Sequence, residues 1–268
     1  MEYQPDDLKR LQSAELSILE EIDELCTRHD IPYFLESGSA LGAMRHEGFI
    51  PWDDDIDICM FRSDYERFIE LFEESRSTDR FDLVFYRNGK AFFPFAKVVD
   101  TTTVVYENFV RKDVGTGVWV DIFILDGIDP AMQNLKALYR KRNRANLLYS
   151  FTVADPNVGS SAMVKLAKRI ICPIVRNRDP KKSARIIDET ASRLCSGESP
   201  FVTDFVGEGL PEHVFDRKLF EPEEVAFEGR RYFAPRGYEE ILTTIYGDWR
   251  TPPTEDNRPI HTCEAYKL

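Results

Sequence analysis

Residues 49–58 read Phe49-Ile50-Pro51-Trp52-Asp53-Asp54-Asp55-Ile56-Asp57-Ile58. Successive side chains of a β-strand point to opposite faces of a sheet, so a strand here would present Asp53, Asp55 and Asp57 on one face and Ile56 on the other, toward a core. Carboxylates at this spacing repel one another unless a cation lies among them. Oxygen ligands favour a hard ion such as Mg²⁺ or Mn²⁺. The stretch therefore predicts a metal site at a strand edge, although an acidic run is more often a solvated loop.

A turn of small residues, Ser37-Gly38-Ser39, precedes the acidic run and follows a short predicted strand at residues 33–36. Small residues at the start of a helix let backbone N–H groups approach a phosphate, assisted by the helix dipole. Arg45 and His46 lie between the two stretches and add hydrogen-bond donors, although a single His is more often structural. A Gly-Ser turn alone is a weak signal, but together with the acidic run it predicts a paired phosphate and metal site.

Two further charged residues lie in predicted strands. Asp121 is embedded in the most strand-like run of the chain, residues 117–126. A buried carboxylate needs a partner, so Asp121 is the candidate third metal ligand beside Asp55 and Asp57. Lys97 lies mid-strand among apolar residues, where it is either an ordinary surface lysine or a cation that neutralises a substrate phosphate.

The composition is that of a globular protein. The chain has 268 residues, of which 43% are hydrophobic and 31% charged. No apolar run approaches the roughly 20 residues of a membrane span, and residues 1–5 do not resemble a signal peptide. The five cysteines are scattered and lack the CxxC spacing of a zinc site. We therefore expect reduced thiols in a cytoplasmic protein.

The net charge of −12 argues against general nucleic-acid binding, but it is unevenly distributed. Residues 131–185 contain thirteen Lys and Arg against Asp155 and Asp179 only. Within this segment, residues 163–171 mix cations with apolar residues in the manner of an interfacial helix. The segment is either a helical insertion with a solvated basic face or a surface that contacts an anionic membrane or a lipid-linked glycan.

The remaining patterns predict helices and strands in the first and the last part of the chain, with the basic helical segment inserted between them. We expect a catalytic core over residues 1–130, the insertion over 131–198, and a C-terminal part, 199–268, that completes the same domain. Helices are expected at residues 6–29, 133–149, 162–175, 182–195 and 238–247. Further strands are expected at residues 81–86, 92–99, 102–106, 201–206, 224–227 and 231–233.

The motif Leu41-Gly42-Ala43-Met44-Arg45-His46-Glu47-Gly48, continued by the acidic stretch quoted above, closely resembles the signature of the LicD family of bacterial phosphorylcholine transferases. That family is related to the fukutin-type ribitol-phosphate transferases. The resemblance continues through Phe93-Pro94-Phe95-Ala96-Lys97, Val120-Asp121-Ile122-Phe123, Ala234-Pro235-Arg236-Gly237-Tyr238 and Tyr246-Gly247-Asp248-Trp249-Arg250. It spans nearly the whole chain and is weakest in the basic segment.

The resemblance implies an α+β, nucleotidyltransferase-like fold, in which a mixed sheet is flanked by helices. It also implies a CDP-activated donor such as CDP-choline or CDP-ribitol. The phospho-group would pass to a hydroxyl of a cell-surface glycan (lipopolysaccharide, capsule or teichoic acid) or of its lipid-linked precursor, in the cytoplasm or at the inner face of the membrane. The metal ligands expected on this template are Asp55, Asp57 and Asp121. The expected catalytic residues are these three and Asp53. The expected substrate-binding residues are Gly38, Ser39, Arg45, His46, Lys97, Asp248 and His261.

In the expected reaction, the acceptor hydroxyl attacks the β-phosphorus of the donor and CMP leaves. Either Asp53 or Asp121 takes the hydroxyl proton. A choline headgroup would favour an aromatic cage, although each aromatic candidate is more simply explained as core. These candidates are Tyr33, Phe34, Phe95, Tyr106 and Trp119.

Two other functions are compatible with the same residues. A nucleotidyltransferase would move a nucleoside monophosphate onto a small molecule and release pyrophosphate. A non-catalytic protein could hold Ca²⁺ with the acidic run, although the embedded Asp121 and the Gly-Ser turn argue against this.

Overall fold

The strand β6, Trp119–Gly127, occupies the middle of the main sheet. The computed structural model describes residues 5–107, 109–111, 115–159, 161–195, 199–255, 258 and 263–267. The side chains of β6 alternate between the two faces of the sheet, as the pleat requires. Val120, Ile122 and Ile124 are completely buried on one face, and Asp121 lies on the other. The two faces of β6 therefore have different roles, one in the core and one at the site.

The neighbours of β6 change along its length. β2 (Ile56–Phe61) runs parallel to it, and β4 (Ala96–Asp100) runs antiparallel along its first residues. From Leu125 onward, β6 pairs with β7 (Phe201–Asp204). In the described residues, the sheet order is β1-β2-β6-β4-β3, extended from the end of β6 by β7 and β8. The short strands are β1 (Phe34–Leu35), β3 (Phe81–Val84) and β8 (Phe215–Asp216).

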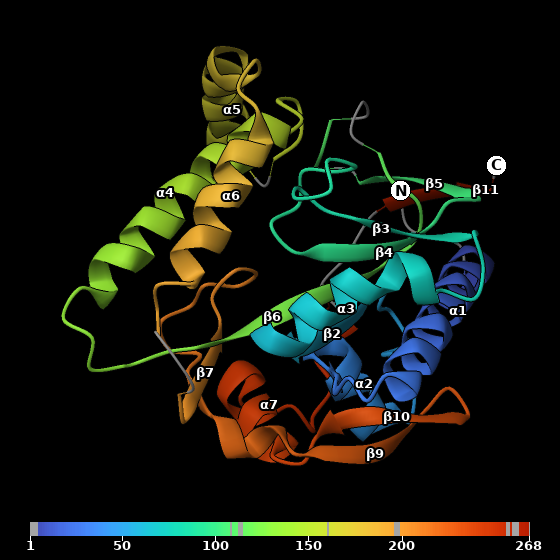
Figure 1. Cartoon of the computed structure of the whole chain (residues 1–268). Helices are drawn as coiled ribbons and strands as arrows, with labels where there is room; N and C mark the ends of the chain where they lie inside the picture. The colour runs from blue at the N-terminus through green and yellow to red at the C-terminus, as the bar shows by residue number, and fades with distance from the viewer. Residues whose placement is uncertain are drawn as a thin grey trace.

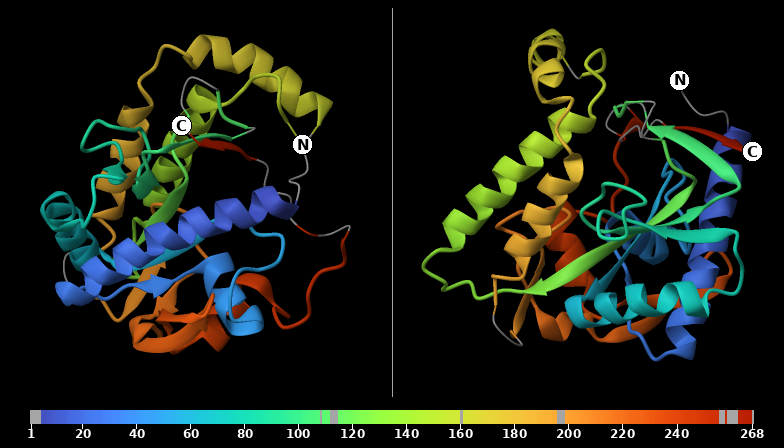
Figure 2. Two further views of the ribbon diagram at one scale, coloured as in Figure 1. Left: turned by 90° about the vertical axis from the view of Figure 1, so that its right-hand side faces the viewer. Right: turned by 45° about the horizontal axis from the view of Figure 1, so that its top comes forward.

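The core face of the sheet is covered by α1 (Pro5–Arg28) and α3 (Arg62–Ser75) (Figures 1 and 2). The periodic apolar residues of both helices lie in the main hydrophobic cluster with the inward residues of β2 and β6. Ile18 and Ile22 of α1 and Phe68 and Phe72 of α3 are completely buried. Burying a side chain of this size contributes about 1.5–3 kcal/mol, so this face anchors the fold.

The opposite face is only partly covered. Beyond the polar residues near its centre, Cys59, Phe61 and Leu125 pack against Phe220 and Ile241. These two residues belong to the 3₁₀ turn η2 (Arg217–Phe220) and to α7 (Tyr238–Tyr246). The hairpin of β9 (Pro222–Phe227) and β10 (Arg230–Pro235) lies beside them (Figure 1). The remaining elements of the core are α2 (Ser37–His46) and the pair formed by β5 (Thr103–Glu107) and β11 (Cys263–Lys267).

The basic segment forms three helices on one side of the sheet: α4 (Leu135–Val153), α5 (Ala162–Val175) and α6 (Pro180–Ala191) (Figure 1). α4 packs along α6, and α5 crosses at the end of the pair that is farther from the sheet. The Arg62 guanidinium joins this unit to the core, because it lies 2.8 Å from Asp126 at the end of β6 and 2.7 Å from Asp188 of α6. Among the described helices, none combines the length and the apolar character needed to cross a bilayer.

The prediction of a mixed sheet flanked by helices is confirmed. The expected alternation of Asp53, Asp55 and Asp57 along one strand is wrong, because β2 begins only at Ile56. The Asp53 N–H donates to the Ile50 carbonyl, so the chain turns through Pro51 and Trp52. The carboxylates of residues 53–55 therefore leave a turn rather than a strand.

Candidate active site

Three neighbouring strands present a row of charged side chains on the open face of the sheet. Asp57 of β2 is paired in register with Asp121 of β6, and Asp121 is paired with Lys97 of β4. Residues that face each other across adjacent strands are about 5 Å apart. The structure thus brings together three of the residues predicted for the site, from positions far apart in the sequence.

Asp121 is held by two donors. The Lys97 ammonium lies 3.0 Å from Oδ1, and the Trp119 indole N–H donates to Oδ2 at 3.1 Å. Asp121 is 8% exposed, and burial raises its pKa while Lys97 opposes that rise. The Lys97 ammonium also lies 4.2 Å from the centre of the Trp119 ring and 4.5 Å from that of Phe93. Lys97 therefore pairs with Asp121 here, and its contact with a substrate phosphate stays a prediction.

The acidic run forms a tight group next to this row. Carboxylate oxygens of Asp53, Asp54 and Asp55 lie within 4.8 Å of one another. Burial, followed by repulsion from Asp55 and Asp54, raises the pKa of Asp53 to about 8. Burial and the charges of Asp55 and Asp121 raise the pKa of Asp57 as well. Such mutual repulsion is relieved when a cation lies among the carboxylates.

The donor set fits a hard divalent ion. It consists of buried and half-buried carboxylate oxygens, which suit Mg²⁺ or Mn²⁺ and not a soft metal. Gly38 leaves room for this group, because a Cβ at that position would lie 2.7 Å from Asp53 Oδ2. The compact group contains Asp54, which the sequence analysis did not single out. The predicted ligands Asp57 and Asp121 lie beside it on the sheet.

The predicted phosphate turn forms the first turn of α2. Ser39 Oγ accepts the Asp57 N–H at 2.9 Å, and the Glu36 N–H donates to the Asp57 carbonyl at 3.0 Å. The start of α2 is thereby fixed against the start of β2. The first N–H groups of a helix have no partner within it, so Gly38 and Ser39 present backbone donors beside the carboxylates, as expected from the sequence.

Arg45 and His46 lie at the other end of α2. Seven residues of helix separate Arg45 from Gly38, or about 10 Å along the axis. The Arg45 guanidinium donates to the Trp249 carbonyl at 2.7 Å, which ties α2 to the segment after α7. Burial lowers the pKa of Arg45, and Asp53 opposes this. Asp248 is exposed in the same segment, and His261 lies outside the described residues.

Glu15 of α1 is a residue that sequence reasoning missed. It is 3% exposed, and its Oε2 has no hydrogen-bond partner among the described residues. Burial and the charges of the acidic run, Asp55 first, raise its pKa well above the usual range. Glu15 occupies a position of α1 at which the helical periodicity places apolar, core-facing residues. An acidic residue at such a position was the signal in the sequence that could have marked Glu15 as a site residue.

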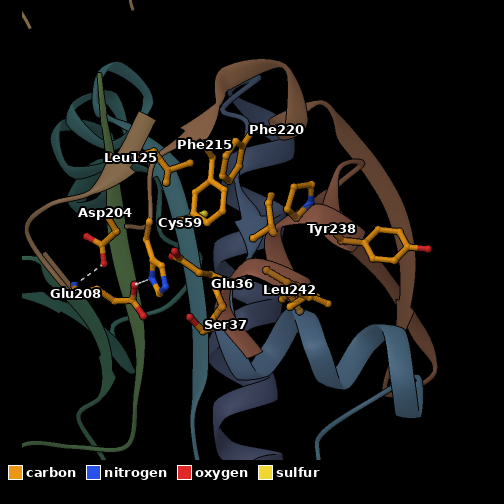
Figure 3. A pocket seen from close by; sticks show the side chains of 16 residues that line it. Glu36, Ser37, Cys59, Leu125, Asp204, Glu208, Phe215, Phe220, Tyr238 and Leu242 are labelled. Atoms are coloured by element: carbon orange, nitrogen blue, oxygen red, sulfur yellow. Dashed lines mark hydrogen bonds and ion pairs between the residues drawn. The ribbon is translucent and has the colours of Figure 1, made fainter. Parts of the chain in front are cut away.

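A small cavity lies farther along the same face of the sheet (Figure 3). Cys59, two residues after Asp57 in β2, lines it together with Leu125 of β6. Its remaining lining is largely aliphatic, with acidic and aromatic side chains among it. The main examples are Glu36, Asp204, Glu208, Phe215 and Phe220.

The acids of this cavity repel one another. Burial raises the pKa of Glu36 well above the usual range, and Asp204 and Glu208 contribute to the rise. Burial also raises the pKa of Asp204 to about 7, although the N–H groups of Gly207 and Glu208 donate to its carboxylate. In Figure 3, Glu36, Asp204 and Glu208 lie around one region of the cavity. These residues could not be predicted as one group from the sequence, because they come from separate segments of the chain.

The aromatic candidates for a cage lie elsewhere. Tyr33 and Phe34 are buried in the core, which agrees with the alternative that these aromatic residues are core residues. Phe95 and Trp119 lie near the Lys97 ammonium, so a cation of the protein itself already occupies that aromatic environment. Tyr106 lies on β5, and none of these five residues lines the cavity.

Comparison with known proteins gives matches at two scales. Residues 30–145 match the family described as LicD/FKTN/FKRP, nucleotidyltransferase domain. The chain is 30% identical over 276 residues to a protein of Haemophilus influenzae named lipopolysaccharide cholinephosphotransferase LicD. The aligned region covers 97% of this chain and 98% of that protein. Uncharacterised proteins of Rickettsia typhi and Rickettsia prowazekii match over 54 and 47 residues, at 43% and 47% identity, covering 20% and 18% of this chain and 18% of each relative.

Proposed function

The chain belongs to the LicD family, and from this premise we propose that it transfers phosphocholine from CDP-choline to a hydroxyl of lipopolysaccharide or of a lipid-linked precursor. The observation that carries the proposal is the row of Asp57 and Asp121 beside the acidic run and the start of α2. A diphosphate fits this arrangement, because its oxygens can bind both a divalent ion and helix N-terminal amides. The similarity to a cholinephosphotransferase over the whole chain supports the same reaction.

In the proposed mechanism, the acceptor oxygen forms a bond to the β-phosphorus and the bond to the CMP oxygen breaks. Asp55, Asp57 and Asp121 would hold Mg²⁺, and when bound this ion would supply positive charge to the diphosphate and to the departing CMP. The amides of Gly38 and Ser39 orient the diphosphate. Asp53 accepts the hydroxyl proton in this scheme, because burial and its acidic neighbours raise its pKa to about 8, whereas Asp121 is paired with Lys97 and is assigned to the ion.

The cavity supports choline as the headgroup. A quaternary ammonium donates no hydrogen bonds and is bound by negative charge and aromatic surface. The cavity offers both, from Glu36 and Asp204 on the acidic side, where Glu208 is paired with His213, and from Phe215 and Phe220 on the aromatic side. An alditol would require hydrogen-bonding groups for each hydroxyl instead. Because the cavity is small, we expect side chains at its edge to move when the headgroup binds.

We propose two further assignments, which the family membership supports. We assign the sheet, with α2 and the carboxylates, to the nucleotidyltransferase-like architecture that the family description names. We also place the reaction in the cytoplasm at the inner face of the membrane, where a lipid-linked glycan would present its hydroxyls.

A donor panel tests the proposal. The protein with Mg²⁺ is incubated with CDP-choline, CDP-ribitol or CDP-glycerol, binding is measured by calorimetry, and CMP release is followed with a lipopolysaccharide acceptor. We expect CDP-choline to bind and react, with a loss of at least about 100-fold in rate for Asp57→Asn. Asp79→Asn, at a highly exposed carboxylate, is the matched control. Pyrophosphate release from nucleoside triphosphates, without binding of any CDP compound, would contradict the proposal and indicate a nucleotidyltransferase.

The headgroup assignment has its own variant. Glu36→Gln removes one acid of the cavity, and we expect it to reduce the preference for CDP-choline over CDP-glycerol about tenfold. The calorimetric affinities of the two donors measure that ratio. An unchanged preference would place the headgroup outside the cavity.

A further inference from the structure

Helix α5 carries an apolar stripe that the fold leaves uncovered. Met163, Leu166, Ile170 and Ile174 recur at intervals of three and four residues, which places them on one face of a helix. They are 81%, 60%, 59% and 73% exposed. The opposite face, with the buried Cys172 and Val175, is turned toward the protein. Exposed apolar residues are ordinary when scattered, but a continuous stripe of four large side chains on one helix marks a binding surface.

A basic edge accompanies the stripe. Lys165 and Arg169 of α5, and Arg176 at its C-cap, fall on one side of the helix because they are spaced by four and seven residues, and all three are exposed. Within the part of the chain that the structure describes, no ion pair is found for them. The stretch from residue 156 to 178 contains no Asp or Glu. The surface is therefore apolar along its centre and positively charged along one edge.

The position of α5 suits contact with a large flat partner. The helix lies at the outer end of α4 and α6, projecting away from the sheet (Figures 1 and 2). A protein groove is not required to cover it, because a bilayer interface accepts an amphipathic helix that lies in its plane. Anionic headgroups complement the basic edge, and acyl chains complement the stripe.

We propose that α5 is a membrane-docking helix, which lies in the surface of an anionic phospholipid bilayer with Leu166, Ile170 and Ile174 inserted and Lys165, Arg169 and Arg176 on the headgroups. The occupant is the lipid surface itself. A second copy of this chain would complement the stripe but would meet the same basic edge with like charge, so charge favours the bilayer. The proposal concerns an interaction surface and does not depend on which donor the enzyme uses.

Vesicle sedimentation tests the proposal. The full chain is mixed with vesicles of phosphatidylcholine alone, or with 30 mol% phosphatidylglycerol, at physiological salt. We expect binding to the anionic vesicles and little binding to the neutral ones. Leu166→Ser/Ile170→Ser should lower the partition coefficient at least about tenfold, because each side chain inserts several methylene groups. Lys165→Gln/Arg169→Gln/Arg176→Gln should lower it about 100-fold on anionic vesicles.

The control removes the same number of charges elsewhere. Lys9→Gln/Arg10→Gln/Lys218→Gln changes exposed cations on α1 and η2 and should bind like the wild type. Circular dichroism confirms that all variants are folded. Equal and negligible binding to both kinds of vesicle would overturn the proposal. So would self-association in sedimentation velocity that Leu166→Ser/Ile170→Ser abolishes, since the stripe would then cover a second copy.

Discussion

At the site, the Lys97 ammonium neutralises the Asp121 carboxylate. Asp53, Asp57 and Glu15 lie close by, and burial raises the pKa of each. The region thus contains more buried acid than its own lysine can balance. Unbalanced buried charge costs several kcal/mol per ion unless a cation compensates it. A divalent ion should consequently contribute to the stability of the fold as well as to the chemistry.

Lys97→Met tests this balance. The substitution keeps the length of the side chain but removes the ammonium, so Asp121 loses its cation. We expect a loss of about 3 kcal/mol in the free energy of unfolding without divalent ions. Added Mg²⁺ should recover part of that loss, because it supplies the missing charge. Thermal unfolding in EDTA and in Mg²⁺ measures both effects, and an equal loss in the two conditions would contradict the prediction.

Glu15→Gln tests the carboxylate that the sequence did not reveal. A carboxylate beside a divalent ion adds Coulomb attraction even when it is not a ligand. We expect the affinity for Mn²⁺ to fall about tenfold while the circular dichroism spectrum stays unchanged. Calorimetric titration gives the affinity, with Glu24→Gln on the exposed side of α1 as control. An unchanged affinity would show that Glu15 does not sense the ion.

At the scale of elements, the close approach of α2 to the turn before β2 defines the site. Two glycines of α2 face this turn for different reasons. A Cβ at Gly38 would meet the Asp53 carboxylate, whereas a Cβ at Gly42 would lie 2.4 Å from the Gly48 carbonyl oxygen. The first contact is with a side chain of the site and the second with the backbone that supports it.

Gly38→Ala should therefore reduce metal affinity, whereas Gly42→Ala should reduce stability. Alanine favours a helix over glycine by about 1 kcal/mol, so Gly38→Ala should retain its stability while losing at least about tenfold in Mn²⁺ affinity. Gly42→Ala should lose about 1–3 kcal/mol of stability through overpacking. Chemical denaturation and calorimetry separate the two. A large stability loss in Gly38→Ala would show that Asp53 cannot move.

Helices and strands were largely predictable from the sequence where the apolar residues followed a single helical or strand periodicity. The bounds of α5 agree with the helix expected from its periodicity. α7 ends at Tyr246 and is capped by Gly247, whose φ of 67° favours glycine. The acidic run was misinterpreted because its alternation imitates a strand while Pro51 and Trp52 form a turn. Asp57, Asp121 and Lys97 could be proposed from their apolar surroundings. Glu36, Asp204 and Glu208 could not, since only the tertiary fold brings them together.

At the scale of the molecule, the basic three-helix unit and the sheet meet at Arg62. Its guanidinium pairs with Asp126 of β6 and Asp188 of α6, and the Tyr86 hydroxyl also donates to Asp188 at 2.6 Å. Asp126 and Asp188 are buried. Three elements that are distant in sequence therefore share one buried ionic contact, and the orientation of α4, α5 and α6 relative to the site depends on it.

Arg62→Met should destabilise the whole molecule. It removes the cation that lies between two buried carboxylates, although Arg87 still lies 3.5 Å from Asp188. We expect a loss of about 3–5 kcal/mol in urea unfolding. Arg67→Met, on the exposed side of the same helix with a 3.5 Å ion pair to Asp64, should change the stability by less than about 1 kcal/mol. Similar losses in the two variants would show that the Arg62 contact adds nothing specific.

The pairing of β6 with β7 has a consequence for how such a chain can diversify. The three-helix unit leaves the sheet after Gly127 and returns by Val202, and these two residues are paired in the antiparallel ladder. Topologically, the whole unit is one very long hairpin loop. Its length and sequence can change while the two strand ends stay where they are. Exchange of this loop between relatives would re-target the enzyme to another surface and leave its chemistry intact, which makes it a natural joint for recombination and for protein engineering.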